Sequence, residues 1–114
     1  MNPQQVMEAL LKAQYDLTKL NDNYKNFGIQ KEHTERTYRM ELRKKLIQLR
    51  AEKTPSSMIQ DLAKGDERIS QLRLERGLAE NNYFTCKEAM NNKRSEIESL
   101  RSILTWQRVE LGNS

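Results

Sequence analysis

The chain has 114 residues, of which 36% are hydrophobic and 32% are charged, and its formal net charge is +4. This length allows one domain at most. Because glycine and proline are scarce, with 4 and 2 residues, the composition favours long helices with narrow apolar stripes and excludes a compact sheet-containing fold. We therefore expect either an elongated chain or a chain that shares its apolar burial with other copies of itself.

Several classes of protein are disfavoured by what the sequence lacks. No basic stretch followed by an apolar run stands at the N-terminus, and no stretch approaches the ~20 apolar residues that cross a bilayer. The lone cysteine, Cys86, and the lone histidine, His33, are far apart, which disfavours a zinc site, and no glycine motif for a phosphate group is present. We therefore expect a cytoplasmic protein that is not an enzyme, does not enter a membrane, and binds no metal and no cofactor.

The first half of the chain carries a heptad pattern, which predicts a helix over about residues 3–52. The pattern continues onto Lys31 and Thr34, which are polar, and then resumes with an extra four-residue step, a stutter. Gly28 lies beside this interruption and lowers helix propensity by about 1 kcal/mol relative to alanine, so a break at Gly28 is the alternative to one continuous helix. The apolar heptad positions are Val6, Leu10, Ala13, Leu17, Leu20, Tyr24, Phe27, Tyr38, Leu42, Leu46 and Leu49.

A connector follows the first helix. Pro55 disfavours helical geometry at Thr54 but suits the first position of a new helix, so we expect Thr54 to cap a short helix over about residues 55–64. Gly65 is expected to end that helix and Asp66 to cap the next one.

A second heptad pattern predicts a helix over about residues 66–111. Three polar residues, Arg76, Lys93 and Gln107, interrupt its apolar positions, and such residues can fix the register of a coiled coil. Two long helices joined by a proline-containing connection most simply form an antiparallel hairpin. We therefore predict an all-α fold, a coiled-coil-like two-helix hairpin with a short connector helix, as one domain over residues 1–114.

Further apolar residues lie outside the two heptad seams, where a lone hairpin would leave them exposed. Exposed apolar surface of this kind usually marks an interface. We therefore expect a homo-oligomer larger than a dimer, while association with a different protein is the competing interpretation. The candidate interface residues are Met40, Ile47, Phe84, Ile103 and Trp106 outside the seams, together with Leu100 and Leu104 of the second seam.

The whole net charge lies in residues 31–53, which hold eight basic and four acidic side chains. At 100° per residue, four arginines of this segment fall within about 60° of one helix face, beside the apolar seam. Arginine suits phosphate geometry, so this face is a candidate nucleic-acid contact. The alternative is a solvated face or a contact for an acidic protein, since pairs such as Glu32–Arg36 and Glu35–Arg39 neutralise part of the charge. The candidate nucleic-acid-binding residues are Arg36, Arg39, Arg43, Lys44, Arg50 and Lys53.

The layout resembles the UvsY-type recombination mediators of bacteriophages. The resemblance is carried mainly by residues 78–90, LAENNYFTCKEAM, followed by the segment 97–101, IESLR. The basic segment 39–45, RMELRKK, is similar to part of the first helix of that family, whereas the segment 54–64 departs from the family pattern. The family has no catalytic signature to compare.

The resemblance implies an accessory factor of phage homologous recombination in the host bacterial cytoplasm. Such a factor forms homo-oligomers, binds single-stranded DNA, and helps a recombinase replace the single-strand-binding protein. The leading hypothesis is therefore a non-enzymatic DNA-recombination accessory protein. The alternative hypothesis is a coiled-coil adaptor or assembly chaperone that binds a protein partner through its exposed apolar stripe.

Overall fold

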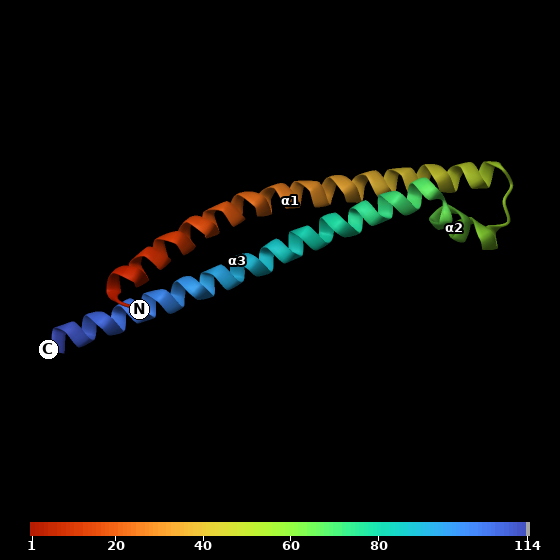
Figure 1. Ribbon diagram of the computed structural model, residues 1–114. Helices are drawn as coiled ribbons and strands as arrows, with labels where there is room; N and C mark the ends of the chain where they lie inside the picture. Colours follow the sequence, from red (N-terminus) through yellow and green to blue (C-terminus); the bar gives the residue numbers. More distant parts are fainter. Residues whose placement is uncertain (114) are drawn as a thin grey trace. The chain divides into compact units, whose positions relative to one another are not determined.

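The structure is a computed structural model that describes residues 1–113. These residues form three α-helices: α1 over Pro3–Ala51, α2 over Ser56–Gly65 and α3 over Glu67–Asn113 (Figure 1). The predicted all-α fold, with two long antiparallel helices and a short connector helix, is confirmed. None of these helices has a stretch apolar and long enough to span a membrane.

The chain divides into two compact units, and both long helices contribute to each. The terminal unit contains Met1–Lys25 and the described part of Phe84–Ser114, and the turn unit contains Asn26–Tyr83. The first unit therefore joins the beginning of α1 to the end of α3, whereas the second joins the end of α1 to α2 and the beginning of α3.

The core of the terminal unit is a cluster of apolar side chains between α1 and α3. Val6, Leu10 and Ala13 of α1 pack with Ile97 and Leu100 of α3. Further along the same seam, the buried thiol of Cys86 lies 3.4 Å from the backbone oxygen of Leu20, and burial raises the pKa of this thiol. Residue numbers rise along α3 as they fall along α1, so the two helix segments are antiparallel.

The turn unit has two apolar clusters, which share Leu42. In the first, Leu42 packs with Tyr38 of α1 and with Ile69 and Leu72 of α3. In the second, Leu42, Leu46 and Leu49 of α1 pack against Ile59 and Ala63 of α2. The apolar stripe of α1 therefore packs against α3 as far as Leu42 and against α2 from Leu42 onward.

The first helix is continuous through Gly28, so the alternative of a break there is wrong. The polar interruption also belongs to the seam: Thr34 is buried, and its hydroxyl donates to the backbone oxygens of Gln30 and Lys31 within its own helix. The ammonium of Lys31 lies 5.5 Å from the centre of the Tyr83 ring on α3. The helix thus runs unbroken, and both polar side chains at this interruption have a partner.

Each polar residue in the α3 seam contacts a group on α1. The guanidinium of Arg76 lies 4.2 Å from the centre of the Tyr38 ring, and its Nε lies 3.6 Å from Glu35. The ammonium of Lys93 lies 3.6 Å from Asp16. The amide of Gln107 donates to the backbone oxygen of Met1 at 3.0 Å. These contacts match one alignment of the two helices, so they favour that register over its alternatives.

The connection between α1 and α2 corrects one sequence expectation. Lys53 has a positive φ of 58°, and the N–H groups of Lys53 and Thr54 donate to the oxygens of Arg50 and Leu49 in a Schellman motif that ends α1. Thr54 does not cap α2, because this helix begins one residue later than expected, at Ser56; its N-cap residue is Pro55, and it has no side-chain cap.

Asp66 caps α3, as predicted. Its carboxylate accepts the backbone N–H of Ile69 at 3.2 Å, while Gly65 is the last residue of α2. Asp66 is thus the single residue between α2 and α3, and its cap sets where α3 begins.

We expect Leu100→Asp to lower the free energy of unfolding by about 3 kcal/mol or more, because it places a charge in the core of the terminal unit. Glu98→Ala, at an exposed position two residues away, is the matched control and should change the stability by less than about 0.5 kcal/mol. Urea denaturation followed by circular dichroism measures both. Equal losses in the two variants would contradict the seam described above.

We also expect Gly28→Ala to stabilise the protein by about 1 kcal/mol, because alanine has the higher helix propensity. A Cβ at position 28 would lie 3.5 Å from the Tyr83 ring, which is an ordinary van der Waals contact. Gly77→Ala is the comparison, because nothing lies within 4 Å of a Cβ there. If thermal denaturation shows a gain for Gly77→Ala and a loss for Gly28→Ala, the packing of Tyr83 against α1 is tighter than described.

Candidate nucleic-acid interface

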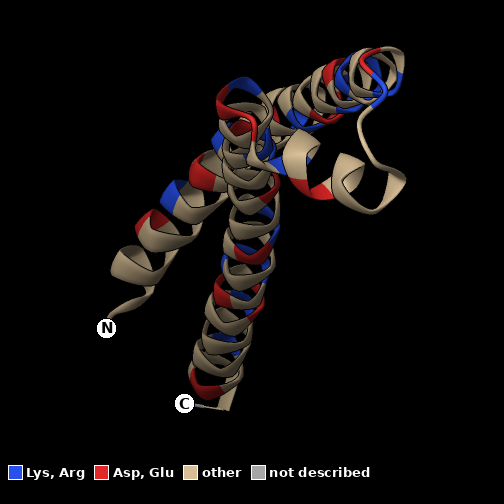
Figure 2. Cartoon of the chain, turned by 90° about the vertical axis from the view of Figure 1, so that its right-hand side faces the viewer, with Lys and Arg blue, Asp and Glu red and all other residues tan. Residues whose placement is uncertain are grey.

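The basic segment 31–53 occupies the last half of α1 and the turn after it, all within the turn unit. Basic and acidic residues alternate along this part of α1, whereas α2 beside it is mostly uncharged (Figure 2). Half of the eight basic side chains lie within 4.0 Å of a carboxylate of the same chain. These four are Lys31 with Glu32, Arg39 with Glu35, Lys44 with Glu41, and Lys45 with Asp66.

The other basic side chains include three exposed arginines on one helix face. Arg36, Arg43 and Arg50 follow one another at intervals of seven residues, which places them about 10 Å apart along the helix axis. No carboxylate among residues 1–113 forms an ion pair with any of the three. Together with Lys53, these arginines are therefore the part of the basic face whose charge is not compensated within residues 1–113. The pairing of Arg36 with Glu32 that the sequence suggests does not form, since Glu32 lies 3.7 Å from Lys31.

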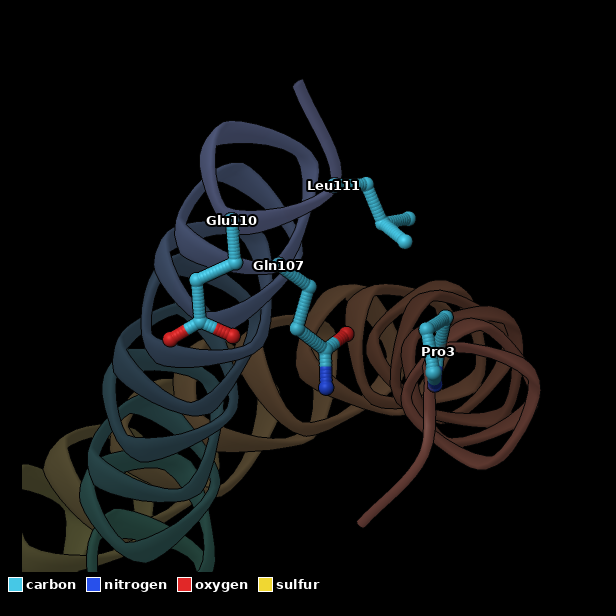
Figure 3. Close-up of a pocket in the computed structure, with 4 residues that line it drawn as sticks. All are labelled: Pro3, Gln107, Glu110 and Leu111. Carbon is cyan, nitrogen blue, oxygen red and sulfur yellow. The ribbon is translucent and has the colours of Figure 1, made fainter. Parts of the chain in front are cut away.

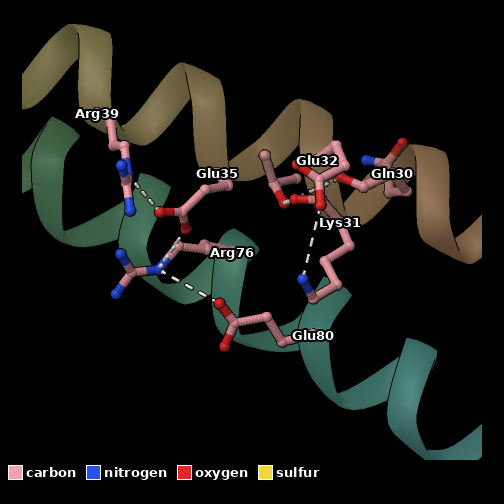
Figure 4. A network of polar contacts seen from close by, with 8 residues as sticks. Gln30, Lys31, Glu32, Glu35, Arg39, Arg76 and Glu80 are labelled. Atoms are coloured by element: carbon pink, nitrogen blue, oxygen red, sulfur yellow. Dashed lines mark hydrogen bonds and ion pairs between the residues drawn. The ribbon is translucent and has the colours of Figure 1, made fainter.

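Arg39 differs from these three arginines because it belongs to a polar network between α1 and α3 (Figure 4). Its guanidinium donates to Glu35, and the other oxygen of the same carboxylate lies 3.6 Å from Nε of Arg76. Nε of Arg76 also lies 3.9 Å from Glu80. Glu35 thus draws Arg39 toward the seam, so a phosphate would have to compete with this carboxylate for Arg39.

Lys44 and Lys53 lie outside the row of three arginines. Lys44 is exposed and is 3.4 Å from Glu41. Lys53 is exposed, but its backbone holds the left-handed conformation that ends α1. Both side chains extend the basic surface, and Lys53 in addition has a conformational role in the turn.

The candidate interface residues separate into a covered group and an exposed group. Leu100 and Leu104 belong to the core of the terminal unit, where α1 covers them. Phe84, Ile103 and Trp106 are exposed on α3 of the same unit, with Trp106 at 69%. The remaining two, Met40 and Ile47, are exposed on α1 in the turn unit, where they are 46% and 58% accessible.

Met40 and Ile47 lie on the same face of α1 as the unpaired arginines. The residues follow one another in the order Arg36, Met40, Arg43, Ile47 and Arg50, with alternating steps of four and three residues. We call these five exposed residues the basic strip. Sequence reasoning listed the arginines and the apolar residues as separate surfaces and missed that they form one strip; the shared heptad spacing was the signal that could have shown it.

The surface also has small hollows, and one lies near the chain termini. Pro3 of α1 and Gln107, Glu110 and Leu111 of α3 line it (Figure 3). The side chain of Gln107 points toward Pro3, whereas the carboxylate of Glu110 points away from it. Within residues 1–113, no group of three or more His, Cys, Asp or Glu side chains is placed to hold a metal ion.

Comparison of this chain with protein-family models, with curated proteins and with solved structures finds no match.

The pH dependence of stability should reveal the contribution of the Asp66 carboxylate, which lies between α2 and α3. The N–H of Ile69 lowers the pKa of Asp66 below its ordinary value of 3.8; partial burial opposes this effect and the Lys45 ammonium adds to it. Because the pKa is lower in the folded state, the stabilisation is complete above the ordinary value and is lost as the pH falls through the folded-state value.

We therefore expect the melting temperature of the wild type to fall more steeply than that of Asp66→Asn when the pH is taken from neutral to well below 3.8. Asparagine keeps the capping oxygen and loses the charge, so the difference between the two curves isolates the carboxylate. Parallel melting curves at all pH values would show that this charge does not stabilise the junction.

Proposed function

We propose that the protein is a non-enzymatic accessory factor of phage DNA recombination that binds single-stranded DNA through the basic face of α1. The observation that carries this proposal is the row of Arg36, Arg43 and Arg50, three exposed cations without a carboxylate partner in the described chain. Such a row attracts a polyanion, and guanidinium groups bind phosphate oxygens in pairs.

The choice of DNA within the class of polyanions rests on the resemblance to UvsY-type mediators. The same resemblance supports the further steps of the proposal, in which the protein helps a recombinase replace the single-strand-binding protein in the host bacterial cytoplasm. These steps need binding and exchange only, so they require no metal, no cofactor and no catalytic residue.

Self-association is the second part of the proposal. Its support is the exposed apolar surface that remains after α1 and α3 have packed in each unit, with Ile47, Phe84 and Trp106 all more than half accessible. Burial of such side chains against another copy gains roughly 25 cal/mol for each Å² of apolar surface removed from water. We propose a homo-oligomer larger than a dimer.

A second candidate function is a coiled-coil adaptor or assembly chaperone. The observation that favours it is the same exposed apolar surface, because a foreign helix with apolar residues could cover it. The two candidates differ in what the arginines do, since an adaptor that uses only apolar contacts has no need of uncompensated cations.

If the arginines bind phosphates, Arg43→Gln combined with Arg50→Gln should weaken binding to oligo(dT) and flatten its salt dependence. Each lost phosphate contact reduces the slope of log affinity against log salt by about 0.7 on single strands, so the slope should fall by about 1.4. Fluorescence polarisation at several salt concentrations measures this slope, and circular dichroism checks that helicity is unchanged.

The matched control is Arg101→Gln combined with Arg108→Gln, which removes the same charge from exposed positions on α3. This control should keep the wild-type slope. If wild-type protein does not bind oligo(dT) at low salt, or if both double variants lower the slope equally, the basic face is not a specific DNA contact and the adaptor becomes the leading candidate.

A further inference from the structure

A second strip of exposed residues, of opposite charge, lies on α3 in the terminal unit. It consists of Glu96, Ser99, Ile103, Trp106 and Glu110, all exposed. At 100° per residue these five positions fall within about 80° of one helix face. We call it the acidic strip. Like the basic strip, it has charged residues at both ends; its central residue is Ile103, whereas the central residue of the basic strip is Arg43.

The spacings of the two strips match when the helices run antiparallel. The basic strip has steps of four, three, four and three residues in the forward direction, and the acidic strip has the same steps when it is followed from Glu110 back to Glu96. Aligned in this way, the strips form five opposite pairs. These pairs are Arg36 with Glu110, Met40 with Trp106, Arg43 with Ile103, Ile47 with Ser99, and Arg50 with Glu96.

The occupant considered for the basic strip is the acidic strip of a second copy of the chain. Within one chain, the part of α1 that carries the basic strip is already packed against α2 and the beginning of α3 in the turn unit. The acidic strip lies instead in the terminal unit, on the far half of α3. Neither strip takes part in the apolar clusters of its own unit, so both are open to another molecule.

Charge decides which pairing of copies is favourable. Pairing two basic strips would bring the unpaired arginines of both copies together. Pairing two acidic strips would bring the glutamates of both copies together. Like charges therefore oppose each pairing of a strip with its own kind. Only the mixed pairing brings an arginine near a glutamate at each end. It also places Met40 against Trp106 beside one of these ends, and Arg43 against Ile103 at the centre.

We propose that copies of this protein associate by antiparallel docking of the basic strip of one copy on the acidic strip of the next. Each copy carries both strips, so the contact is head-to-tail and a third copy can join as readily as the second. Such contacts close into a ring or extend as a filament, depending on the rotation between copies.

This contact uses arginines that the proposed DNA contact also uses. The inference therefore rests in part on the proposed function: if both hold, an arginine paired with a glutamate of the next copy is not available to a phosphate. Assembly and DNA binding then oppose one another, and by thermodynamic linkage each weakens the other to the same degree.

Of the two glutamates in the acidic strip, Glu110 allows the clearer test. Glu96 already accepts from the Lys93 ammonium of its own chain at 2.8 Å, whereas Glu110 has no ion pair among residues 1–113 and its carboxylate points away from Pro3 (Figure 3). Its partner in the alignment is Arg36, which is likewise without a carboxylate partner in the described chain.

The test exchanges these two charges in the full chain. Sedimentation velocity should show loss of the assembly for Arg36→Glu and for Glu110→Arg, and its recovery when the two changes are combined. Glu98→Arg, the same substitution at an exposed position off the acidic strip, is the matched control and should assemble like the wild type. Circular dichroism confirms that every variant keeps its helices.

Binding to oligo(dT), measured on the same four variants, separates the two proposals. Arg36→Glu and the combined variant should lower the salt slope by about 0.7, whereas Glu110→Arg should keep the wild-type slope and bind more tightly, because its strip is freed. A monomeric wild type at tens of micromolar, or a combined variant that does not reassemble, overturns the head-to-tail contact. If neither the wild type nor any variant binds DNA, the proposed function and the competition between DNA and assembly are both overturned. The sedimentation result alone then decides whether the contact between the strips exists.

Discussion

The structure depends on the heptad seam between α1 and α3. Apolar side chains recur on both helices at steps of three and four residues, and burying them is the main gain that two such helices obtain from packing in water. The seam is narrow, so it does not cover the whole circumference of either helix. Everything on the outward faces, including the basic and acidic strips, is left exposed by this geometry.

The polar residues of the seam give the pairing its specificity. An apolar heptad alone would tolerate a shift of one helix past the other by seven residues, since apolar contacts have little direction. The contacts of Arg76 with Glu35 and Tyr38, and of Lys93 with Asp16, form in one alignment of the helices only. The pKa of Lys93 is raised, chiefly by Glu96 and with a contribution from Asp16, in keeping with a charged ammonium held among carboxylates.

The positive charge of the basic face comes from the cations that the fold leaves without a carboxylate partner. Glu35, Glu41 and Asp66 lie where they can compensate Arg39, Lys44 and Lys45. The arginines that remain are spaced seven residues apart and alternate with apolar side chains, so they form a surface suited either to phosphates or to a helix that carries both carboxylates and apolar groups. We propose both uses, and their competition would connect the state of assembly to the binding of DNA.

The sequence by itself determined the secondary structure and the pairing, because helical periodicity and the stop signal at Pro55 are local properties of the chain. It also located the segment that carries the net charge. It placed the N-cap of α2 one residue too early, at Thr54, because local sequence signals locate a helix end only to within one or two residues. It left Gly28 open, because helix propensity at one position does not include the packing of the residues on both sides of it.

Only the tertiary structure decided which candidate side chains are available. Leu100 and Leu104 are covered by α1, and Arg39 is held by a carboxylate that also contacts α3, whereas Arg36 and Arg43 are uncompensated. Composition and spacing give the number and the order of such groups along one helix. Exposure and the ion pairs between helices depend on residues distant in the sequence, as with Glu35 and Arg76, which are 41 positions apart.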